Sequence, residues 1–279
     1  MSYEYIPVGT DDKAMNEIAE LLCLVFPNTK KYSEAFIKWQ YKANPDGAVI
    51  GFNAYQNGIL AAHYAAIPMR AKLFGKEEKG LLSLNTATHP DHQGNKLFTA
   101  LAELTYKAAA EKGYGFVIGI ANASSTPGFI NKLGFQLVGA LDAKLGFGKI
   151  NTSEKKDLQF TKIWNKGSID WKLANPEVKY KIKENVIYSA TDKTGIEAIL
   201  LDVSSLKPLP DNNVSLGFRP IKLWIGIDPS INWNRSLYFN IPDSMRPSPL
   251  NLIFKDLTLA NRKLEKSKIC FNAFDFDAY

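Results

Sequence analysis

The fold is decided by the run Leu81-Leu82-Ser83-Leu84-Asn85-Thr86-Ala87-Thr88 and by the segment directly after it in the chain. This largely apolar run has the length of a buried strand, and Pro90 in His89-Pro90-Asp91-His92 stops it. The next segment, Gln93-Gly94-Asn95-Lys96-Leu97-Phe98, holds a turn glycine and leads into a helical spacing of apolar and small residues. We therefore predict a strand, a tight turn and a helix, and backbone N–H groups at such a turn form an anion site.

The same pattern continues beyond the helix. Gly113 ends the helical spacing, and the apolar run Phe116-Val117-Ile118-Gly119-Ile120-Ala121 comes next. After Asn122, a short helical segment ends at Lys132-Leu133-Gly134-Phe135. Residues 81–135 are thus expected to form strand, turn, helix, strand and short helix.

This stretch resembles the central motif of the GNAT (Gcn5-related) acyl-CoA N-acyltransferases. In that family a strand, a Gln/Arg-x-x-Gly-x-Gly/Ala turn and a helix hold the CoA pyrophosphate. The segment from His89 to Phe98 and three others resemble the sugar N-acyltransferases of bacterial surface-polysaccharide and nucleotide-sugar pathways. The three are Trp39-Gln40-Tyr41-Lys42-Ala43-Asn44-Pro45, Asn122 with Ser125-Thr126-Pro127-Gly128-Phe129, and Ile241-Pro242-Asp243. The likeness is specific over residues 33–150 and weaker beyond them.

Three positions depart from the family pattern. Lys96 stands where the family prefers Gly, and Phe98 where it prefers Gly or Ala. Many GNAT enzymes also carry a Tyr that protonates the departing thiolate, and Ile130 occupies that position here. The resemblance therefore implies a CoA site but leaves the protonation of the leaving group unassigned.

Length and composition limit the class of protein. The 279 residues, 46% of them hydrophobic, allow one large or two ordinary domains with a real core. Cys23 and Cys270 lie far apart and suggest no disulfide framework. No signal peptide or apolar run near 18 residues is visible, so we expect a cytoplasmic protein without a membrane partner. The net charge of +6 suits an anionic ligand as well as an ordinary basic surface. No basic stripe or motif points to nucleic acid.

The rest of the first half shows local signals of helices and strands. Asp11 or Asp12 could cap a helix that runs to Val25, and a second helix is expected over residues 33–41. Asn57-Gly58 predicts a hairpin between strands 48–55 and 60–69. Residues 136–147 are expected to close this half as one strand or a strand pair.

The second half contains an echo of the first. Phe36 to Pro45 is repeated in Ser168-Ile169-Asp170-Trp171-Lys172-Leu173-Ala174-Asn175-Pro176, and strand-like runs come after both segments. Here we expect a helix over residues 195–203 and a closing strand over 269–279. No second Gln-x-x-Gly turn occurs. We therefore predict an α/β fold with a mixed sheet and tandem GNAT-like halves. Residues 1–150 form the complete acyl-CoA-binding half, and residues 151–279 a degenerate half that contributes to the acceptor site.

Acyl transfer to an amine requires a polarised thioester carbonyl, a neutral amine within attack distance and a departing thiolate. His63, in the middle of a predicted strand, is the candidate base because imidazole titrates near working pH; the alternative is a structural His. Asn122 is a second candidate, for binding pantetheine or a water; the alternative is a helix cap. Lys96 either adds a cation to the phosphates or is solvated. Asp275 and Asp277 either grip sugar hydroxyls or end a solvated strand.

The expected site residues fall into two further groups. The acyl-CoA-binding group is Thr86, Ala87, Thr88, Gln93, Gly94, Asn95, Lys96, Leu97, Phe98, Asn122 and Ser125. The acceptor-binding group is Tyr64, Asn85, Asp275 and Asp277. No His, Cys and carboxylate spacing indicates a metal site, and no Gly-x-Ser-x-Gly motif indicates a serine nucleophile.

The resemblance implies an acyl-CoA-dependent N-acyltransferase. Its co-substrate would be acetyl-CoA or a 3-hydroxyacyl-CoA such as 3-hydroxybutanoyl-CoA. Its acceptor would be a small amino sugar, linked to dTDP or UDP, for a surface glycan such as lipopolysaccharide, and attack would be direct. Two alternatives remain: a transferase acting on a peptide, protein or polyamine amine, and a non-catalytic acyl-CoA-binding module. The oligomeric state is not indicated.

Overall fold

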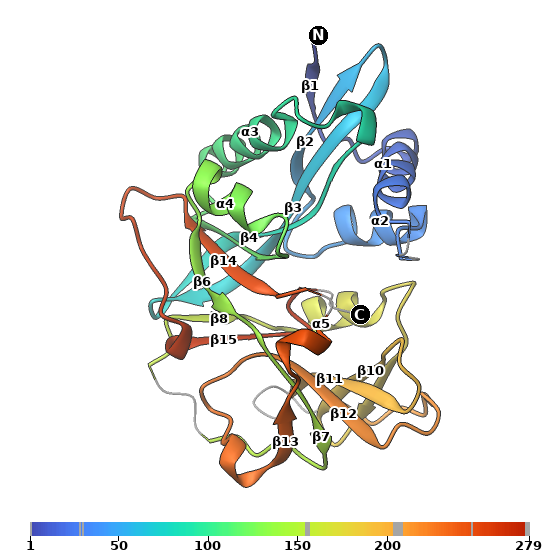
Figure 1. Cartoon of the computed structure of the whole chain (residues 1–279), viewed down its shortest axis with the longest axis vertical. Helices are drawn as coiled ribbons and strands as arrows, with labels where there is room; N and C mark the ends of the chain where they lie inside the picture. Colours follow the sequence, from blue (N-terminus) through green and yellow to red (C-terminus); the bar gives the residue numbers. More distant parts are fainter. Residues whose placement is uncertain are drawn as a thin grey trace.

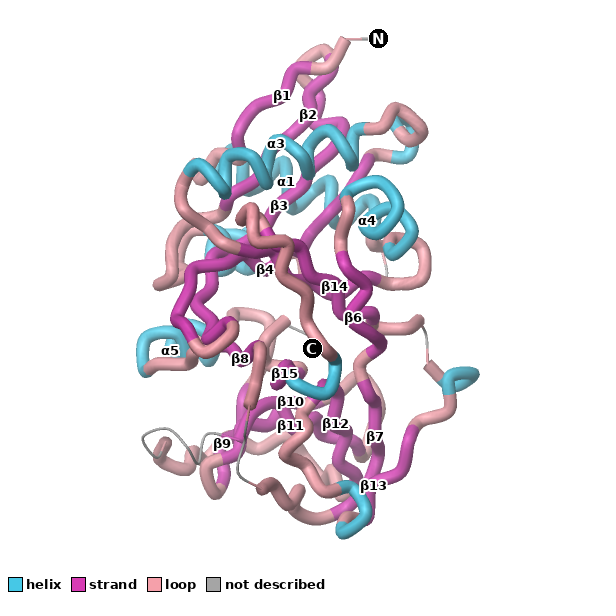
Figure 2. The backbone as a smooth tube through the Cα atoms, turned by 90° about the vertical axis from the view of Figure 1, so that its left-hand side faces the viewer, coloured by secondary structure: helices cyan, strands magenta, loops and turns pink. Residues whose placement is uncertain are grey.

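The computed structural model describes residues 2–27, 29, 31–153, 157–202, 209–246 and 248–276. Two stacked regions make up the molecule (Figure 1). The upper region contains the elements of residues 4–140 and one strand from the far end of the chain. The lower region contains most of the remaining strands, and Figure 2 shows that most of the helical residues belong to the upper region.

The helices and strands of the first half come in the order expected for strand, helix pair, hairpin and crossover. They are β1 (Glu4–Pro7), α1 (Asp12–Val25), α2 (Glu34–Tyr41), β2 (Ile50–Gln56), β3 (Ile59–Leu73), β4 (Lys76–Thr88), the short 3-10 helix η1 (Pro90–His92), α3 (Leu97–Glu111), β5 (Phe116–Ala121), α4 (Thr126–Leu133), β6 (Gln136–Ala140) and β7 (Asp142–Phe147).

The second half is built mostly of strands. Its elements are β8 (Phe160–Lys162), α5 (Lys166–Leu173), β9 (Tyr180–Lys183), β10 (Val186–Ala190), β11 (Ile196–Asp202), β12 (Ile221–Ile227), η2 (Trp233–Arg235), β13 (Leu237–Asn240), η3 (Asp243–Met245), β14 (Asn251–Asp256), η4 (Lys266–Lys268) and β15 (Ile269–Asn272).

Local chemistry explains the first elements. The side chain of Asp11 accepts the Ala14 N–H at the start of α1, and Ser33 accepts the Phe36 N–H at the start of α2. Asn57-Gly58 has positive φ at both residues and joins β2 to β3, as a two-residue hairpin turn requires. The predicted helices and hairpin of residues 11–69 are therefore confirmed.

Helices cover both faces of the first-half sheet. Alternate residues of β3 point to opposite sides: Ala65, Ile67 and Met69 pack in the core that contains α1 and α2. Tyr64 and Ala66 pack in the core that contains α3 and α4. Because the sheet is buried on both faces, its central strands read as continuous apolar runs.

The two halves exchange one strand each. β14 comes from the second half but inserts between β5 and β6, antiparallel to both. β7 comes from the first half but inserts between β12 and β13, again antiparallel to both. Figure 1 shows the exchange by colour, with orange-red β14 beside green β6 and green β7 beside orange β12 and the darker orange β13. Each half of the sheet therefore contains a strand from the other half of the chain. The division of the chain at residue 150 stays a prediction.

The expected internal repeat has a structural counterpart in two tryptophans. The indole of Trp39 on α2 stacks on that of Trp171 on α5, with centroids 4.9 Å apart. Each indole N–H donates to the other residue's carbonyl oxygen, at 2.7 and 3.0 Å. The same turn comes after each helix, because Asn44 accepts the Asp46 N–H and Asn175 accepts the Glu177 N–H. The α/β class with a mixed sheet is confirmed, and the sheet is compatible with two GNAT-like halves.

Two predictions for the second half are wrong. Residues 196–202 form β11, parallel to β12, rather than a helix over 195–203. The closing strand β15 ends at Asn272 and residues 273–276 turn away from it, so the strand is shorter than expected.

Candidate active site

The site begins where β4 and β5 separate. These parallel strands pair only from Gly80–Ser83 to Phe116–Gly119. Beyond this point β4 continues to Thr88 and β5 to Ala121 without pairing each other. Since paired strands use their backbone groups on each other, the separation leaves N–H and C=O groups of both strands available to a ligand.

A β-bulge shapes the open edge of β4. The register with β3 shifts between His63 and Ala65, and Asn85 has a φ of +48°. The His89 N–H donates to the Ala61 carbonyl on β3. Because N–H groups alternate between the two sides of a strand, those of Thr86 and Thr88 face the side that β5 has left. The open edge thus presents donors suited to a thioester carbonyl or a pantetheine amide.

The gap between the strands is a cleft of about 740 Å³. Six expected ligand-binding residues line it: Asn85, Thr86, Thr88, Phe98, Asn122 and Ser125. Ser83, Ser124, Asn131 and Lys132 add polar groups, and Phe26, Phe129 and Leu250 add apolar ones. Among the described lining residues, none is acidic.

The turn before α3 is where the sequence predicted an anion site, and its backbone geometry is consistent with one. Gly94 has a φ of +79° and Lys96, the N-cap residue, a φ of +58°. The first helical bond runs from the Ala100 N–H to the Lys96 carbonyl, so the N–H groups of residues 97–99 have no partner within the helix. Residues 93–96 are exposed and Leu97 is buried. The exposed N–H groups suit a pyrophosphate.

Asn85 is held by a hydrogen-bond network on the α2 side of β4. Its amide nitrogen donates to Gln40 Oε1 at 2.6 Å and to the Tyr41 hydroxyl at 3.0 Å. Both amide hydrogens are therefore used, and Asn85 Oδ1 has no partner among the described residues. This fixes one neutral acceptor at the edge of the cleft.

The network continues from Tyr41 into the core through His63. Tyr41 Oη lies 2.8 Å from His63 Nε2, and His63 Nδ1 lies 2.6 Å from Asn53 Oδ1. His63 is fully buried, does not line the cleft, and burial lowers its pKa to about 3. A neutral imidazole that donates to Asn53 and accepts from Tyr41 satisfies both bonds. The position therefore argues against a direct base and favours a residue that positions Asn85 through Tyr41.

Asn122 stands at the opposite wall, at the end of β5. Its Oδ1 accepts the Ser125 N–H at 2.9 Å, and its carbonyl accepts the Thr126 N–H at 3.0 Å. These bonds organise the start of α4, as the helix-cap alternative expected. The side chain is also exposed in the cleft, so a ligand contact stays a prediction.

Three hydroxyl groups form a second network on the α3 side of β4. Tyr64 Oη lies 2.7 Å from Ser83 Oγ and 2.6 Å from the Tyr106 hydroxyl. Tyr64 is fully buried and burial raises its pKa to about 12, whereas Ser83 lines the cleft. Tyr64 therefore reaches the cleft only through Ser83 and does not contact an acceptor directly.

Several predicted residues lie away from the cleft. Asp275 is 2% exposed in the turn after β15 and accepts hydrogen bonds from the Trp164 indole and the Asn272 N–H. This position does not support a direct contact with substrate. Asp277 lies outside the described residues. Ala87 is buried and pairs with His63 across the β3–β4 ladder, so it contributes backbone alone.

Sequence reasoning assigned no role to Gln40, Tyr41, Ser83 or Tyr106. A signal was present for two of them, because Gln40 and Tyr41 belong to the Trp39–Pro45 segment that carries the family resemblance. Ser83 interrupts an apolar run with a hydroxyl, which is a local signal as well. Tyr106 has the spacing of an ordinary core residue of α3, and its partners are visible in the fold alone.

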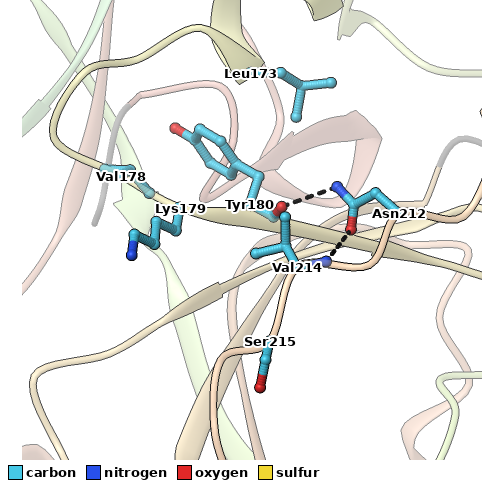
Figure 3. A pocket seen from close by; sticks show the side chains of 7 residues that line it. All are labelled: Leu173, Val178, Lys179, Tyr180, Asn212, Val214 and Ser215. Carbon is cyan, nitrogen blue, oxygen red and sulfur yellow. Dashed lines mark hydrogen bonds between the residues drawn. The ribbon is translucent and has the colours of Figure 1, made fainter.

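A hollow of about 520 Å³ lies in the second half, between the end of α5, β9 and residues 212–215. Figure 3 shows its lining. The Asn212 side chain donates to the Tyr180 carbonyl and accepts the Val214 N–H. These bonds hold residues 212–214 against the edge of β9, so the Asn212 side chain in this hollow has a structural role.

Two findings concern metals and membranes. Among the described residues, no group of three or more His, Cys, Asp and Glu side chains could hold a metal ion. In the same part of the chain, no helix has the length and apolar character needed to cross a bilayer.

Comparison with known proteins identifies the fold. Residues 9–138 match the family model described as "Acetyltransferase (GNAT) domain". No curated protein sequence matches the chain. An Enterococcus faecalis V583 structure described as "Probable N-Acyltransferase" matches with a TM-score of 0.62 and 10% identity, over 94% of this chain and 74% of that chain. A GCN5-related N-acetyltransferase from Anabaena variabilis matches with a TM-score of 0.60 and 11% identity, over 93% and 74%.

A further match is the N-myristoyltransferase of Saccharomyces cerevisiae, solved with bound myristoyl-CoA and inhibitors. Its TM-score is 0.60 at 9% identity, over 95% of this chain and 82% of that chain. At such identities these structures show the fold, and the family match adds the type of domain. Residues 9–138 thus match a GNAT acetyltransferase domain, and this match and the N-acyltransferase structures that share the fold support an acyl-CoA N-acyltransferase.

Proposed function

We propose that this enzyme transfers an acetyl or short hydroxyacyl group from CoA to the amine of an amino sugar linked to a nucleoside diphosphate. One observation carries the choice of acceptor: the described cleft lining has hydroxyl and amide side chains and one cation, Lys132, but no carboxylate. Neutral hydrogen-bonding groups suit sugar hydroxyls. The absence of acidic groups from this lining disfavours a polyamine, whose several positive charges would require them.

The acyl-CoA would lie along the open edge of β4. Its pyrophosphate fits the N–H groups at the start of α3, and its pantetheine fits the N–H groups of Thr86 and Thr88. The net charge of +6 favours two anionic substrates, CoA and a nucleotide sugar. The cytoplasm, where both substrates are made, is the proposed location.

Asn85 would orient the amine. An amine that attacks a thioester carbon must direct its lone pair at that carbon, so an acceptor that holds one N–H restricts its orientation. Asn85 Oδ1 is such an acceptor, because Gln40 and Tyr41 occupy both hydrogens of its amide. The second amine proton would leave through water, since His63 is buried and neutral.

The test is a thiol-release assay with purified protein. Acetyl-CoA and 3-hydroxybutanoyl-CoA are each combined with amino sugars, free and linked to dTDP or UDP, and with spermidine and a Lys peptide. Free CoA that appears with a nucleotide-linked amino sugar alone would support the proposal. Release of CoA with spermidine alone or with the peptide alone would instead identify the acceptor as a polyamine or a peptide. Asn85→Ala should raise KM for the acceptor and leave the affinity for CoA unchanged.

A further inference from the structure

The sequence leaves one catalytic function unassigned, because Ile130 replaces the Tyr that would protonate the leaving thiolate. Ile130 is partly buried and packs against the α3–α4 core. A donor for the sulfur must therefore come from another residue that faces the cleft on this side of the sheet.

We propose that Ser83, aligned by Tyr64 and Tyr106, donates a hydrogen bond to the sulfur of the leaving CoA thiolate. This inference rests on the acyl transfer proposed above and goes further, since it names the group that stabilises the leaving atom. Ser83 lines the cleft at the last β4–β5 pair, Ser83 with Gly119, where the gap between the strands begins.

The hydroxyl network gives Ser83 a free hydrogen. Each hydroxyl carries one hydrogen and can accept up to two bonds. If Tyr106 donates to Tyr64 and Tyr64 donates to Ser83, the Ser83 hydrogen is left to point into the cleft. The reverse direction would leave the Tyr106 hydrogen buried without an acceptor among the described residues, which is unfavourable because the hydroxyl would lose its hydrogen bond to water and gain none. Satisfaction of the buried hydroxyls therefore orients Ser83 toward the cleft.

Ser83 and Asn85 belong to networks on opposite faces of β4. Ser83 bonds to Tyr64 and Tyr106 on the α3 side, and Asn85 bonds to Gln40 and Tyr41 on the α2 side. The amine would be held from one face and the sulfur from the other. Such an arrangement places the entering nitrogen and the leaving sulfur on different sides of the acyl carbon.

The proton balance limits what Ser83 does. The amine nitrogen forms a bond to the acyl carbon, the C–S bond breaks, and its electron pair stays on sulfur. The amine loses one proton to water. A free cysteine thiol has a pKa of about 8.5, and an alkyl thiol such as that of CoA is a far stronger acid than Tyr64 here, because burial raises the pKa of Tyr64 to about 12. The cluster therefore keeps its protons and stabilises the thiolate by hydrogen bonding, and CoA takes its proton from solvent as it leaves.

The test uses hydroxylamine as a small amine, because it reports on thioester cleavage without recognition of the natural acceptor. Ser83→Ala should lower kcat about 100-fold, the lower end of the range for loss of one preorganised donor in a water-poor site. Its calorimetric affinity for CoA should not change. Tyr64→Phe should lower kcat by a smaller factor, since Ser83 keeps its hydroxyl but loses its orientation. Ser83→Thr keeps the hydroxyl and should recover part of the rate.

The control and a second acyl donor separate this role from a structural one. Ser189 is another buried serine, with no hydrogen-bond partner in the described structure, and Ser189→Ala should match the wild type. With the acyl-selenoester of CoA, whose selenolate is the weaker base, the Ser83→Ala deficit should shrink several-fold. An equal deficit with both donors, an unchanged kcat for Ser83→Ala, or wild-type protein that does not accelerate hydroxylaminolysis would each overturn the inference. Hydroxylaminolysis without transfer to any amino sugar would instead count against the proposed acceptor alone.

Discussion

The two halves solve the same structural problem in different ways. In the first half, β4 and β5 pair over four residues and then separate around an open cleft. In the second half, β11 and β12 also pair over four residues, Ile196–Ile199 with Ile221–Trp224. There β15 pairs with β12 at Gly226 and Ile227. The other side of β12 is occupied by β7, which pairs with it as far as Gly226, opposite Asp142. β15 therefore lies on the same side of β12 as β11, where a gap between β11 and β12 would otherwise open.

The difference shows what a separated strand pair requires. Backbone groups that lose a strand partner need water, a ligand or another strand. In the second half the chain supplies its own strand, and in the first half the position is left to a ligand. In the second half, the described residues between β11 and β12, 209–220, form no helix, so none of them forms a turn like the one before α3. The two described halves therefore differ both at the gap and in the segment that comes after its first strand.

The largest effect is expected from loss of the strand that fills the second gap. Phe271 of β15 is fully buried and contacts Phe160 and Phe276. Phe271→Ala should reduce the free energy of unfolding by about 3–5 kcal/mol, because it leaves a cavity in the core. KM for acyl-CoA should stay near the wild-type value. Urea unfolding measures the loss, with the exposed Phe218→Ala as the control. A loss below about 1 kcal/mol would show that β15 is dispensable to the core.

A smaller effect, on ligand binding, is expected at the turn of the first half. Gly94 has a φ of +79°, and Pro fixes φ near about −65°. Gly94→Pro should distort the N–H groups that we propose to bind the phosphates, and so weaken CoA binding about 30- to 100-fold by calorimetry. Gly217 in the second half has a φ of +76° and is the matched control. Equal affinities for the Gly94 variant and the wild type would refute the assignment of the phosphate site.

The comparison also shows which parts of the fold the sequence could predict. The cap of the first helix, expected at Asp11 or Asp12 and found at Asp11, and the turn at Asn57-Gly58 depend on neighbouring residues, so they were predicted correctly. Residues 196–202 form an apolar run that fits either a strand or a buried helix. Parallel pairing with β12 decides the matter, and that contact is not local. The exchange of β7 and β14 is likewise a property of the whole sheet.

The site was predictable where its residues belong to the motif. Thr86, Thr88 and Asn122 line the cleft because the strand order after a GNAT-like turn places them there. His63 illustrates the limit. An imidazole beside the motif has the right chemistry for a base, but its sequence does not reveal that Tyr41 and Asn53 enclose it. Burial and partners, which depend on distant segments, change its role.

The two halves should also differ in how pH affects their stability, because all three histidines lie in the first half. Burial lowers the pKa of His63 from 6.5 to about 3 in the folded state. The unfolded chain therefore binds a proton first as the pH falls. Neutral His63 contributes fully to the free energy of unfolding above pH 6.5. This contribution is lost as the pH falls from 6.5 to about 3, by about 1.4 kcal/mol per pH unit. His63→Gln should lose less stability than the wild type between pH 7.5 and 5 in urea unfolding. His89 and His92 are present in both proteins, and equal losses would show that His63 is not the buried neutral group.

The smallest effect is expected at Lys96, where two contributions oppose each other. A non-glycine residue at a φ of +58° is strained by about 1–2 kcal/mol, and glycine costs roughly 0.5–1 kcal/mol of chain entropy. Lys96→Gly should therefore change the free energy of unfolding by less than about 1 kcal/mol, and in the stabilising direction. Glu184 has a φ of +52° in the β9–β10 turn, so Glu184→Gly tests the same relief of backbone strain in the second half.

Affinity for CoA then distinguishes the two roles of Lys96. If the ammonium attracts the phosphates, Lys96→Gly weakens CoA binding a few-fold and reduces its salt dependence, while Glu184→Gly changes neither. If the side chain is solvated, both variants bind CoA like the wild type. In the first case, the strain at Lys96 is offset by the attraction of its ammonium group to the phosphates of CoA in the open gap. In the second case, the Lys96 side chain does not contribute to CoA binding, and the backbone N–H groups of the turn alone bind the pyrophosphate.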